Sequence, residues 1–294
     1  MPILASAHPV VWLVFLALLL PTVAQGGAQT FGTALPVAEG NGVLRQQFLH
    51  REAGGDGREL AVSGGVTLLG YGASRDLTLF GALPYLDKRL TADGIRRGSE
   101  GLGDLRLWAR YTLYRDDAPG RTLRIAPYLG LETPTGRDDD RDALGRLPRP
   151  LQPGSGSWDP FVGVVATYQT LDVEFDAQFA YQVNTEAEGF AFGDMARLDG
   201  AAQYRLWPRV LSGGVPGFLY GVLEANLIHR DPDELHGEAT PDSGGTRLLL
   251  APGLQYVTRR WVIEGIIQLP IVRDLDGSAP EDDAILRAGV RFNF

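Results

Sequence analysis

The stretch LDVEFDAQFAYQV, residues 171–183, decides the fold because polarity changes at almost every residue along it. Its apolar or small members are Val173, Phe175, Ala177, Phe179, Tyr181 and Val183. Its polar members are Glu174, Asp176, Gln178 and Gln182. A β-strand separates two such sets onto opposite faces, whereas a helix scatters both sets around its axis. The stretch therefore predicts a strand with one apolar and one polar face.

The same alternation recurs along the chain. At 59–69 the apolar set is Leu60, Val62, Val66 and Leu68, opposed by Glu59, Ser63 and Thr67. We place strands at 43–50, 58–70, 76–86, 103–114, 121–132, 160–169, 171–183, 194–206, 218–230, 246–257, 261–271 and 283–294. Most exceed the roughly five or six residues common in globular sheets, and a bilayer requires tilted strands of about nine to eleven. The sequence thus predicts an all-β fold, a transmembrane antiparallel up-and-down β-barrel of about 12 strands.

The connections between these strands alternate between short and long. The short ones contain residues 71–75, 115–120, 169–170 and 258–260. The long ones contain residues 87–102, 133–159, 184–193, 231–245 and 273–282. A barrel with short periplasmic turns and long extracellular loops produces this alternation when the N-terminus and the C-terminus of the chain are both periplasmic.

The start of the chain carries an export pattern. Val10 to Leu20 are eleven consecutive apolar residues, followed by Pro21 and small residues. A membrane helix needs about 20, so this is the apolar core of a signal peptide, residues 1–24, with cleavage after Ala24 or as late as Ala28. An uncleaved anchor is the alternative. Because no later apolar stretch approaches helix-spanning length, insertion into a membrane requires a closed barrel, which we place at residues 43–294.

Residues 25–42 lie between the signal and the first strand and are rich in Gly and Ala. We interpret them as a periplasmic N-terminal segment without fixed structure. The alternative is that they fold inward and plug the lumen.

The polar face of the strands holds many ionisable side chains, which lipid cannot solvate and which therefore face the lumen. The predicted lumen-lining residues are Arg106, Arg110, Arg124, Glu132, Glu174, Asp176, Arg197, Asp199, Arg205, Glu224, Arg247, Glu264, Arg287 and Arg291. One interpretation is that they form cross-strand pairs of opposite charge that stiffen the wall. The other is that some of them line a solute path and set its selectivity.

The last strand ends on Phe294, and its apolar face is Leu286, Ala288, Val290, Phe292 and Phe294. A terminal aromatic residue on the lipid face resembles the signal read by the outer-membrane barrel assembly machinery. We therefore expect Phe294 to act as an assembly signal.

Several classes of function find no support in the sequence. The chain has no cysteine and a net charge of -9, which argues against disulfides, thiolate metal sites and nucleic-acid binding. Two acidic loops suggest calcium, around Asp138–Asp142 and around Asp231–His236. The first lacks the spacing and the bidentate Glu of an EF-hand loop, and we interpret both as solvated loops, so we predict no metal and no cofactor. No catalytic motif is present, and the four histidines do not favour a barrel hydrolase, so we predict that the protein is not an enzyme.

Short motifs in the chain resemble those of the outer-membrane barrel family named after the meta-pathway of phenol degradation. They are Tyr71-Gly72, Leu83-Pro84-Tyr85, Gly101-Leu102-Gly103-Asp104-Leu105, Thr133-Pro134-Thr135-Gly136, Gly193-Asp194, Tyr204-Arg205-Leu206 with Pro208, and Pro252-Gly253-Leu254-Gln255-Tyr256. The resemblance implies an outer-membrane location and passage of small, often hydrophobic or aromatic compounds. It implies no catalytic residues.

The expected function is a passive outer-membrane channel for such solutes, with membrane lipids and the assembly machinery as its other partners. One alternative is a structural or adhesive barrel with a blocked lumen and partner-binding loops. Another is a lipid-modifying barrel enzyme.

Overall fold

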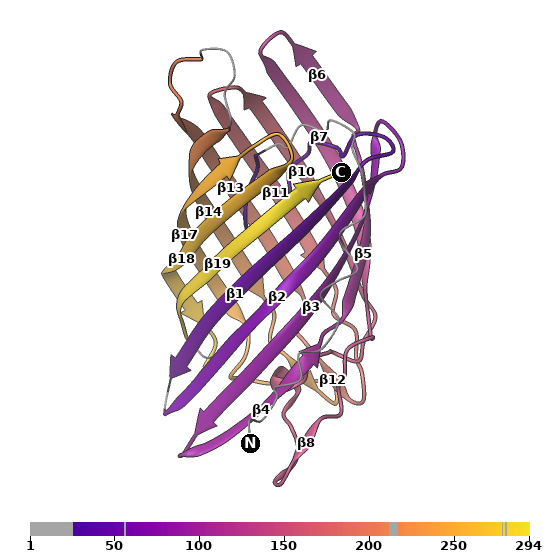
Figure 1. Cartoon of the computed structure of the whole chain (residues 1–294). Helices are drawn as coiled ribbons and strands as arrows, with labels where there is room; N and C mark the ends of the chain where they lie inside the picture. Colours follow the sequence, from indigo (N-terminus) through magenta and orange to yellow (C-terminus); the bar gives the residue numbers. More distant parts are fainter. Residues whose placement is uncertain (1–25, 56, 212–216, 278, 280) are drawn as a thin grey trace, which may run out of the picture.

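The computed structural model describes residues 26–55, 57–211, 217–277, 279 and 281–294, and these form a closed antiparallel barrel of 12 strands (Figure 1). The predicted signal peptide lies outside the described residues, apart from the cleavage alternative at Ala28. The wall consists of β1 (Gly42–Gly55), β2 (Arg58–Gly72), β3 (Leu77–Ala92), β4 (Ile95–Leu102), β5 (Leu105–Tyr111), β6 (Tyr114–Ala118), β7 (Arg121–Thr133), β10 (Asp159–Thr170), β11 (Val173–Gln182), β13 (Met195–Trp207), β14 (Phe218–Arg230), β17 (Gly245–Val257), β18 (Trp261–Leu275) and β19 (Glu281–Asn293). Here β4, β5 and β6 are successive pieces of one barrel strand, because β4 and β5 both pair with β3, and β5 and β6 both pair with β7.

Pairing between the first and last strands closes the barrel. Val43 lies opposite Asn293, and the antiparallel register continues to Gly54 opposite Glu281. The amide of Gly42 donates to the carbonyl of Phe294 at 2.7 Å. No edge of the main sheet is left between β1 and β19, which is the condition for spanning a bilayer with strands.

The predicted strand positions agree with the observed ones along most of the wall, with several differences. Residues 115–118, predicted to lie in a short connection, belong to β6, and β18 continues to Leu275, beyond the predicted end at residue 271. β1 continues to Gly55, beyond the predicted end at residue 50. The predicted long loop at 87–102 is wrong, because β3 runs to Ala92 and pairs with β4 across a turn at Asp93 and Gly94. Both residues have positive φ, 52° for Asp93 and 75° for Gly94. A two-residue hairpin turn of type I′ requires positive φ at both positions.

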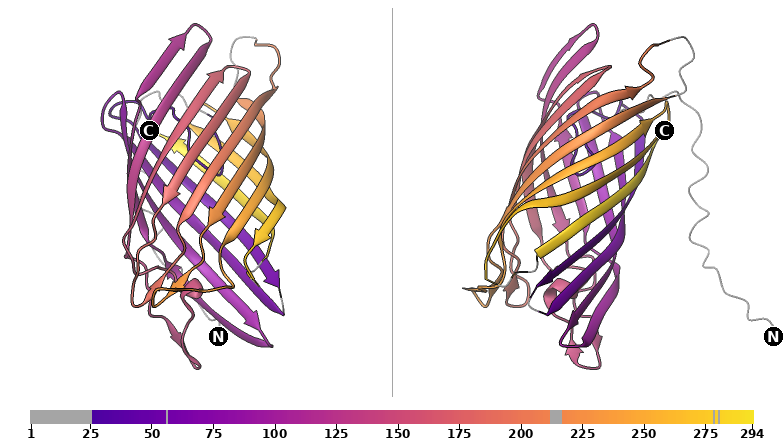
Figure 2. Two further views of the ribbon diagram at one scale, coloured as in Figure 1. Left: turned by 180° about the vertical axis from the view of Figure 1, so that it is seen from behind. Right: turned by 90° about the vertical axis from the view of Figure 1, so that its left-hand side faces the viewer.

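The two ends of the barrel differ, as the alternating connections predict. The turn end, at the top of Figure 1, holds the short connections 73–76, 119–120, 171–172 and 258–260 and the ends of β1 and β19. The loop end holds the connections 134–158, 183–194 and 231–244, with the short elements β8 (Arg141–Asp142), β9 (Gly145–Arg146), η1 (Arg149–Leu151), β12 (Phe190–Ala191), β15 (Glu234–Leu235) and β16 (Glu238–Ala239). Figure 2 shows these loops gathered below the wall. Leu147 and Leu151 are buried there.

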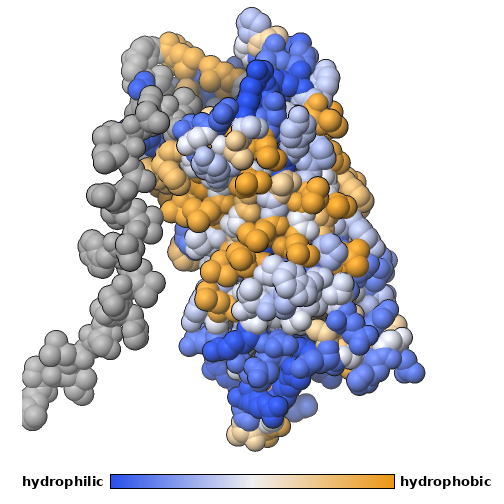
Figure 3. All heavy atoms as spheres, turned by 90° about the vertical axis from the view of Figure 1, so that its right-hand side faces the viewer, coloured by the Kyte–Doolittle hydropathy of each residue, from blue (hydrophilic) through white to orange (hydrophobic). Residues whose placement is uncertain are grey.

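Exposed apolar side chains form a belt on the outer face, and Figure 3 shows them gathered across the middle of one side. On β11 the expectation from the sequence is confirmed: Phe175 and Phe179 are about half exposed, whereas Glu174 and Asp176 are buried. Other exposed apolar side chains of the wall are Phe48, Leu79, Leu107, Leu129, Val162, Leu198, Leu223, Leu254, Ile263, Leu286 and Val290. Within the described residues, no helix is long and apolar enough to cross a membrane.

On β2 the faces are the reverse of those predicted. Leu68 pairs with Arg45 and Val66 with Gln47, and both β1 side chains bond to groups inside the barrel, so the apolar set of β2 faces inward. Thr67 faces outward, where its hydroxyl donates to the side-chain oxygen of Gln46 at 2.6 Å. This mutual hydrogen bond satisfies two polar groups on the outer face.

Candidate functional site: the barrel lumen and its N-terminal segment

Residues 26–41, here called the lumen segment, lie inside the barrel toward the turn end (Figures 1 and 2). Ala28, Gln29, Ala34 and Leu35 are among its buried residues. The expectation of an unstructured periplasmic tail therefore does not hold for these residues, and the inward-folding alternative does. The wall offers what a free tail lacks, namely hydrogen-bond partners for its backbone and apolar surface for its side chains.

Glu224 on β14 anchors the first part of the lumen segment. Its carboxylate accepts the amide of Gln29 at 2.5 Å and the amide of Thr30 at 3.1 Å, and it also accepts the Thr30 hydroxyl. Nearby, Gln255 on β17 both accepts from the amide of Gly27 and donates to its carbonyl. A buried carboxylate that accepts several N–H and O–H donors is a strong, charge-assisted anchor.

Arg110 on β5 anchors the second part. Its guanidinium donates to the carbonyl of Thr33 and, at 2.6 Å, to that of Leu35. The hydroxyls of Thr167 on β10 and Thr78 on β3 accept the amides of Ala34 and Val37 at 2.8 and 3.2 Å. The segment is thus held on both sides by side chains that satisfy its backbone groups.

The residues predicted to line the lumen all lie on the inner face of the wall, as their cross-strand partners place them. Most of the arginines pair with carboxylates. The ion pairs are Arg106–Glu132 at 3.3 Å, Arg124–Asp117 at 3.1 Å, Arg197–Asp199 at 2.9 Å, Arg247–Asp282 at 3.0 Å and Arg291–Glu264 at 3.5 Å, and Arg205 pairs with Asp172. Glu174 accepts from Gln169, and Asp176 accepts from Thr167 at 2.5 Å.

Many of these contacts match the interpretation as cross-strand pairs that stiffen the wall. Whether any of the same residues line a solute path stays a prediction. Arg110 and Arg287 differ from the rest, because no carboxylate pairs with either among the described residues.

An aromatic cluster occupies the inner face of β3, β5, β7 and β10. The rings of Phe80 and Trp108 stack with centroids 5.0 Å apart, and Phe161 meets Trp108 edge to face at 6.4 Å. The guanidinium of Arg106 lies 4.5 Å from the Phe161 ring, and that of Arg110 lies 4.9 Å from the Phe80 ring. This surface is suited to flat apolar or aromatic molecules.

The sequence analysis missed several lumen residues. Arg45 lies 2.5 Å from Glu264, and Arg51 lies 2.5 Å from Asp282. Both arginines belong to β1, whose alternation is weak, and Asp282 precedes the predicted start of the last strand. The uncharged Gln255 and Gln268 also face inward and are buried, and alternation alone could have found them.

The acidic loops form ion pairs at the loop end. Asp138 lies 3.0 Å from Arg149, Asp140 lies 3.1 Å from Arg137, and Asp142 lies 2.7 Å from Arg97. The hydrogen bond from Arg97 lowers the pKa of Asp142. In the part of the chain that the structure describes, no cluster of His, Asp and Glu side chains is arranged to hold a metal ion.

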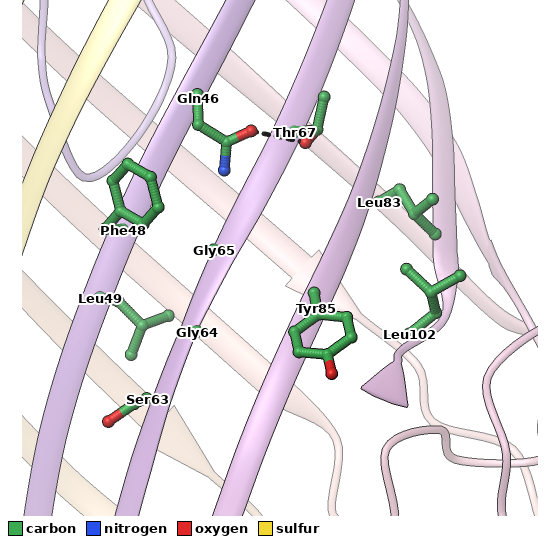
Figure 4. Close-up of a pocket in the computed structure, with 10 residues that line it drawn as sticks. All are labelled: Gln46, Phe48, Leu49, Ser63, Gly64, Gly65, Thr67, Leu83, Tyr85 and Leu102. Carbon is green, nitrogen blue, oxygen red and sulfur yellow. Dashed lines mark hydrogen bonds between the residues drawn. The ribbon is translucent and has the colours of Figure 1, made fainter. Parts of the chain in front are cut away.

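A groove of about 520 Å³ runs along the outer face over β1, β2 and β3 (Figure 4). Phe48 and Tyr85 stand on either side of the glycine pair Gly64–Gly65 of β2. Ser63 at its border lies 2.8 Å from Nδ1 of His50, whose Nε2 lies 3.3 Å from Glu52. The three side chains resemble a hydrolase triad, but Ser63 lies in a ladder paired on both sides, so its neighbouring amides are engaged in the sheet rather than free to stabilise an oxyanion.

The closed wall, the apolar belt and the polar lumen together define an outer-membrane β-barrel. The family whose model is described as "Putative MetA-pathway of phenol degradation" matches residues 55–264, and the chain belongs to that family. The resemblance seen in the sequence motifs is thereby confirmed.

Comparison with solved structures shows that this fold is shared with a known outer membrane channel. The COG4313 outer membrane channel from Pseudomonas putida F1 superposes with a TM-score of 0.64 at 16% identity, covering 89% of this chain and 97% of that chain. The beta domain of the Bordetella autotransporter BrkA gives 0.49 at 14% identity, covering 85% and 98%. The CymD monoaromatic hydrocarbon channel gives 0.39 at 11% identity, covering 87% and 89%. No curated protein matches the chain significantly.

Proposed function

We propose that the protein is a non-enzymatic outer-membrane channel through which small, hydrophobic or aromatic solutes diffuse passively. The observation that supports this most directly is the aromatic cluster on the inner wall, where Phe80, Trp108 and Phe161 offer ring surface inside the barrel. The lumen segment lies inside the same barrel and is attached to the wall by hydrogen bonds with Glu224, Thr167 and Arg110. Contacts of this kind can break and form again, so the segment can move aside for a solute.

The proposal includes the route by which the protein reaches its membrane. We expect export through a signal peptide at residues 1–24 and insertion by the barrel assembly machinery, with lipid contacts over the apolar belt. Phe294 supports the insertion step, because it stacks on Phe292 with centroids 6.3 Å apart and is partly exposed at the end of β19. Its role as an assembly signal stays a proposal.

Liposome swelling tests the channel function. Purified protein is reconstituted and challenged with graded sugars and with neutral aromatic alcohols, beside a matched variant that lacks residues 26–40. We expect the aromatics to enter faster than sugars of similar size, and deletion of the lumen segment to accelerate both. No permeation through either protein would contradict the proposal.

A barrel with a permanently blocked lumen is the second candidate, and the lumen segment is the observation that favours it. Such a barrel would act as a structural or adhesive protein through the loops 134–158, 183–194 and 231–244. Planar-bilayer recordings separate the two candidates, because a blocked wild-type barrel passes no current whereas the channel does. Release of fatty acid from lipids by the purified protein would instead favour the enzyme alternative.

A further inference from the structure

Arg287, like Arg110, has no carboxylate partner among the described residues, but its donors bond to side-chain amides of the wall rather than to the lumen segment. Its Nε donates to the side-chain oxygen of Gln268 at 2.7 Å, and its Nη1 to that of Gln47 at 3.3 Å. Nη2 has no hydrogen-bond partner among the described residues. The guanidinium therefore keeps its full charge and one free donor edge inside the barrel.

Within the part of the chain that the structure describes, no carboxylate forms an ion pair with this charge. The carboxylates of the adjoining wall are already shared, Glu264 by Arg45 and Arg291 and Asp282 by Arg51 and Arg247. Glu224 attracts Arg287 from β14 without direct contact, and its oxygens accept the amides of Gln29 and Thr30 in the lumen segment. The wall formed by β17, β18, β19 and β1 thus carries more arginines than carboxylates, which favours an anion.

Apolar side chains adjoin Arg287 on the inner face. Leu49 on β1 lies directly opposite Arg287, and Ile266 on β18 pairs with it on the other side. On the other side of β1, Leu49 pairs with Gly64 on β2, and Gly64 in turn pairs with Leu86 on β3. Leu49 and Leu86 are only partly buried. Because Gly64 has no side chain, Leu86 packs over it, with Cδ2 3.0 Å from where a Cβ would lie, and the row forms an apolar surface beside the guanidinium.

The position along the barrel suits a solute that arrives from the loop end. Gln47, which accepts from Arg287, donates from its Nε2 to the carbonyl of Gln29 in the lumen segment at 3.0 Å. On β1, Leu49 lies nearer to the loop end than Gln47. Arg287 and its apolar neighbours therefore lie next to the lumen segment, on the side that faces the loop end.

We propose that this site binds a small organic monoanion with an apolar body, such as an aromatic carboxylate. The carboxylate would accept from the free edge of Arg287, in the geometry that guanidinium groups favour, while the apolar body packs on Leu49 and Leu86. The inference rests on the proposed channel function, since it names a class of solute for the same lumen.

Equilibrium binding to the full-length mature protein in detergent tests the site without requiring permeation. The ligands are benzoate and its neutral analogue benzyl alcohol, titrated into wild type, Arg287→Gln, Arg287→Lys and Leu49→Asn. The matched control is Arg259→Gln, which removes one charge from an exposed position at the turn end. Heat-modifiable migration on gels verifies that each variant forms a folded barrel.

We expect Arg287→Gln to weaken benzoate binding about tenfold or more, because a hydrogen bond to a charged partner is lost. Arg287→Lys keeps most of the affinity, Arg259→Gln keeps all of it, and Leu49→Asn weakens both ligands. Equal benzoate affinities in wild type and Arg287→Gln would overturn the inference, as would benzyl alcohol binding as tightly as benzoate. If benzoate binds as expected but neither ligand crosses liposomes, the channel function fails and the binding site stands.

Discussion

Replacement of Arg110 by methionine addresses the attachment of the lumen segment to the wall. Arg110 donates to the carbonyls of Thr33 and Leu35, and methionine keeps much of the side-chain length without the donors. Each hydrogen bond from a charged group contributes about 1.5–3 kcal/mol. Taking the lower value for both, docking of the segment loses about 3 kcal/mol, which raises the undocked fraction about 100-fold.

A cysteine placed in the segment reports this fraction, because the chain has no cysteine of its own. Leu35 is buried, so a thiol in Leu35→Cys reacts with a membrane-impermeant maleimide only when the segment leaves its place. We expect Arg110→Met to accelerate labelling about 100-fold when undocking is in rapid equilibrium. The matched control is Arg247→Met, which removes a lumen arginine that pairs with Asp282 in the wall.

Two results would refute this reasoning. Unchanged labelling in Arg110→Met would mean that the hydrogen bonds to the segment do not hold it. Equal acceleration in Arg247→Met would mean that loss of any lumen arginine loosens the barrel, so that the effect is not specific to the segment.

Three further predictions concern the wall and the loops. Leu129→Arg places a charge on the apolar belt and should lower the unfolding free energy in lipid vesicles by about 2–4 kcal/mol, whereas Leu144→Arg in a loop should not; equal losses would argue against the belt. Gly130→Ala puts a methyl group 2.4 Å from the Phe161 ring and should destabilise the barrel by about 1–3 kcal/mol in the same assay, whereas Gly200→Ala, with open space around it, should be neutral. In an NMR titration, the pKa of the Asp142 carboxyl should lie below its ordinary value of 3.8, because the ionised form accepts the hydrogen bond from Arg97. The Asp142–Arg97 contact is therefore fully formed above pH 3.8 and is lost as the pH falls through the lowered pKa. The same pKa for Asp142 in wild type and in Arg97→Gln would contradict this.

The strand positions could be predicted because alternation with a period of two survives wherever one face meets lipid and the other meets polar groups. On β11 both faces follow this rule. On β1 the pattern weakens, because Gln46 and His50 face outward and Leu49 faces inward, so Arg45 and Arg51 escaped notice.

The orientation of β2 could not be predicted from its own residues. Alternation shows that two sets of side chains separate, but not which set faces lipid. Leu68 and Val66 face inward because the inner wall is itself apolar here, and Thr67 is accommodated outside by its bond to Gln46. Only the register with neighbouring strands decides between the two orientations.

The lumen segment had no sequence signal, because residues 26–41 show no periodicity and their small residues are equally common in unstructured tails. What orders the segment is a set of partners far away in the chain. Thr30 and Glu224 are separated by 194 positions, and Ala34 and Thr167 by 133. Contacts of this range are fixed by the closed architecture rather than by local preference.

The anchors of the lumen segment also constrain the order of assembly. Thr78, Arg110, Thr167, Glu224 and Gln255 belong to strands distributed around most of the circumference. They surround a common space only after β19 has met β1, so the stretch of chain that leaves the ribosome before the wall is the last to reach its place. In a partly folded barrel the lumen segment must therefore stay out of the gap between β1 and β19. Pairing of these two strands then encloses the segment inside the barrel.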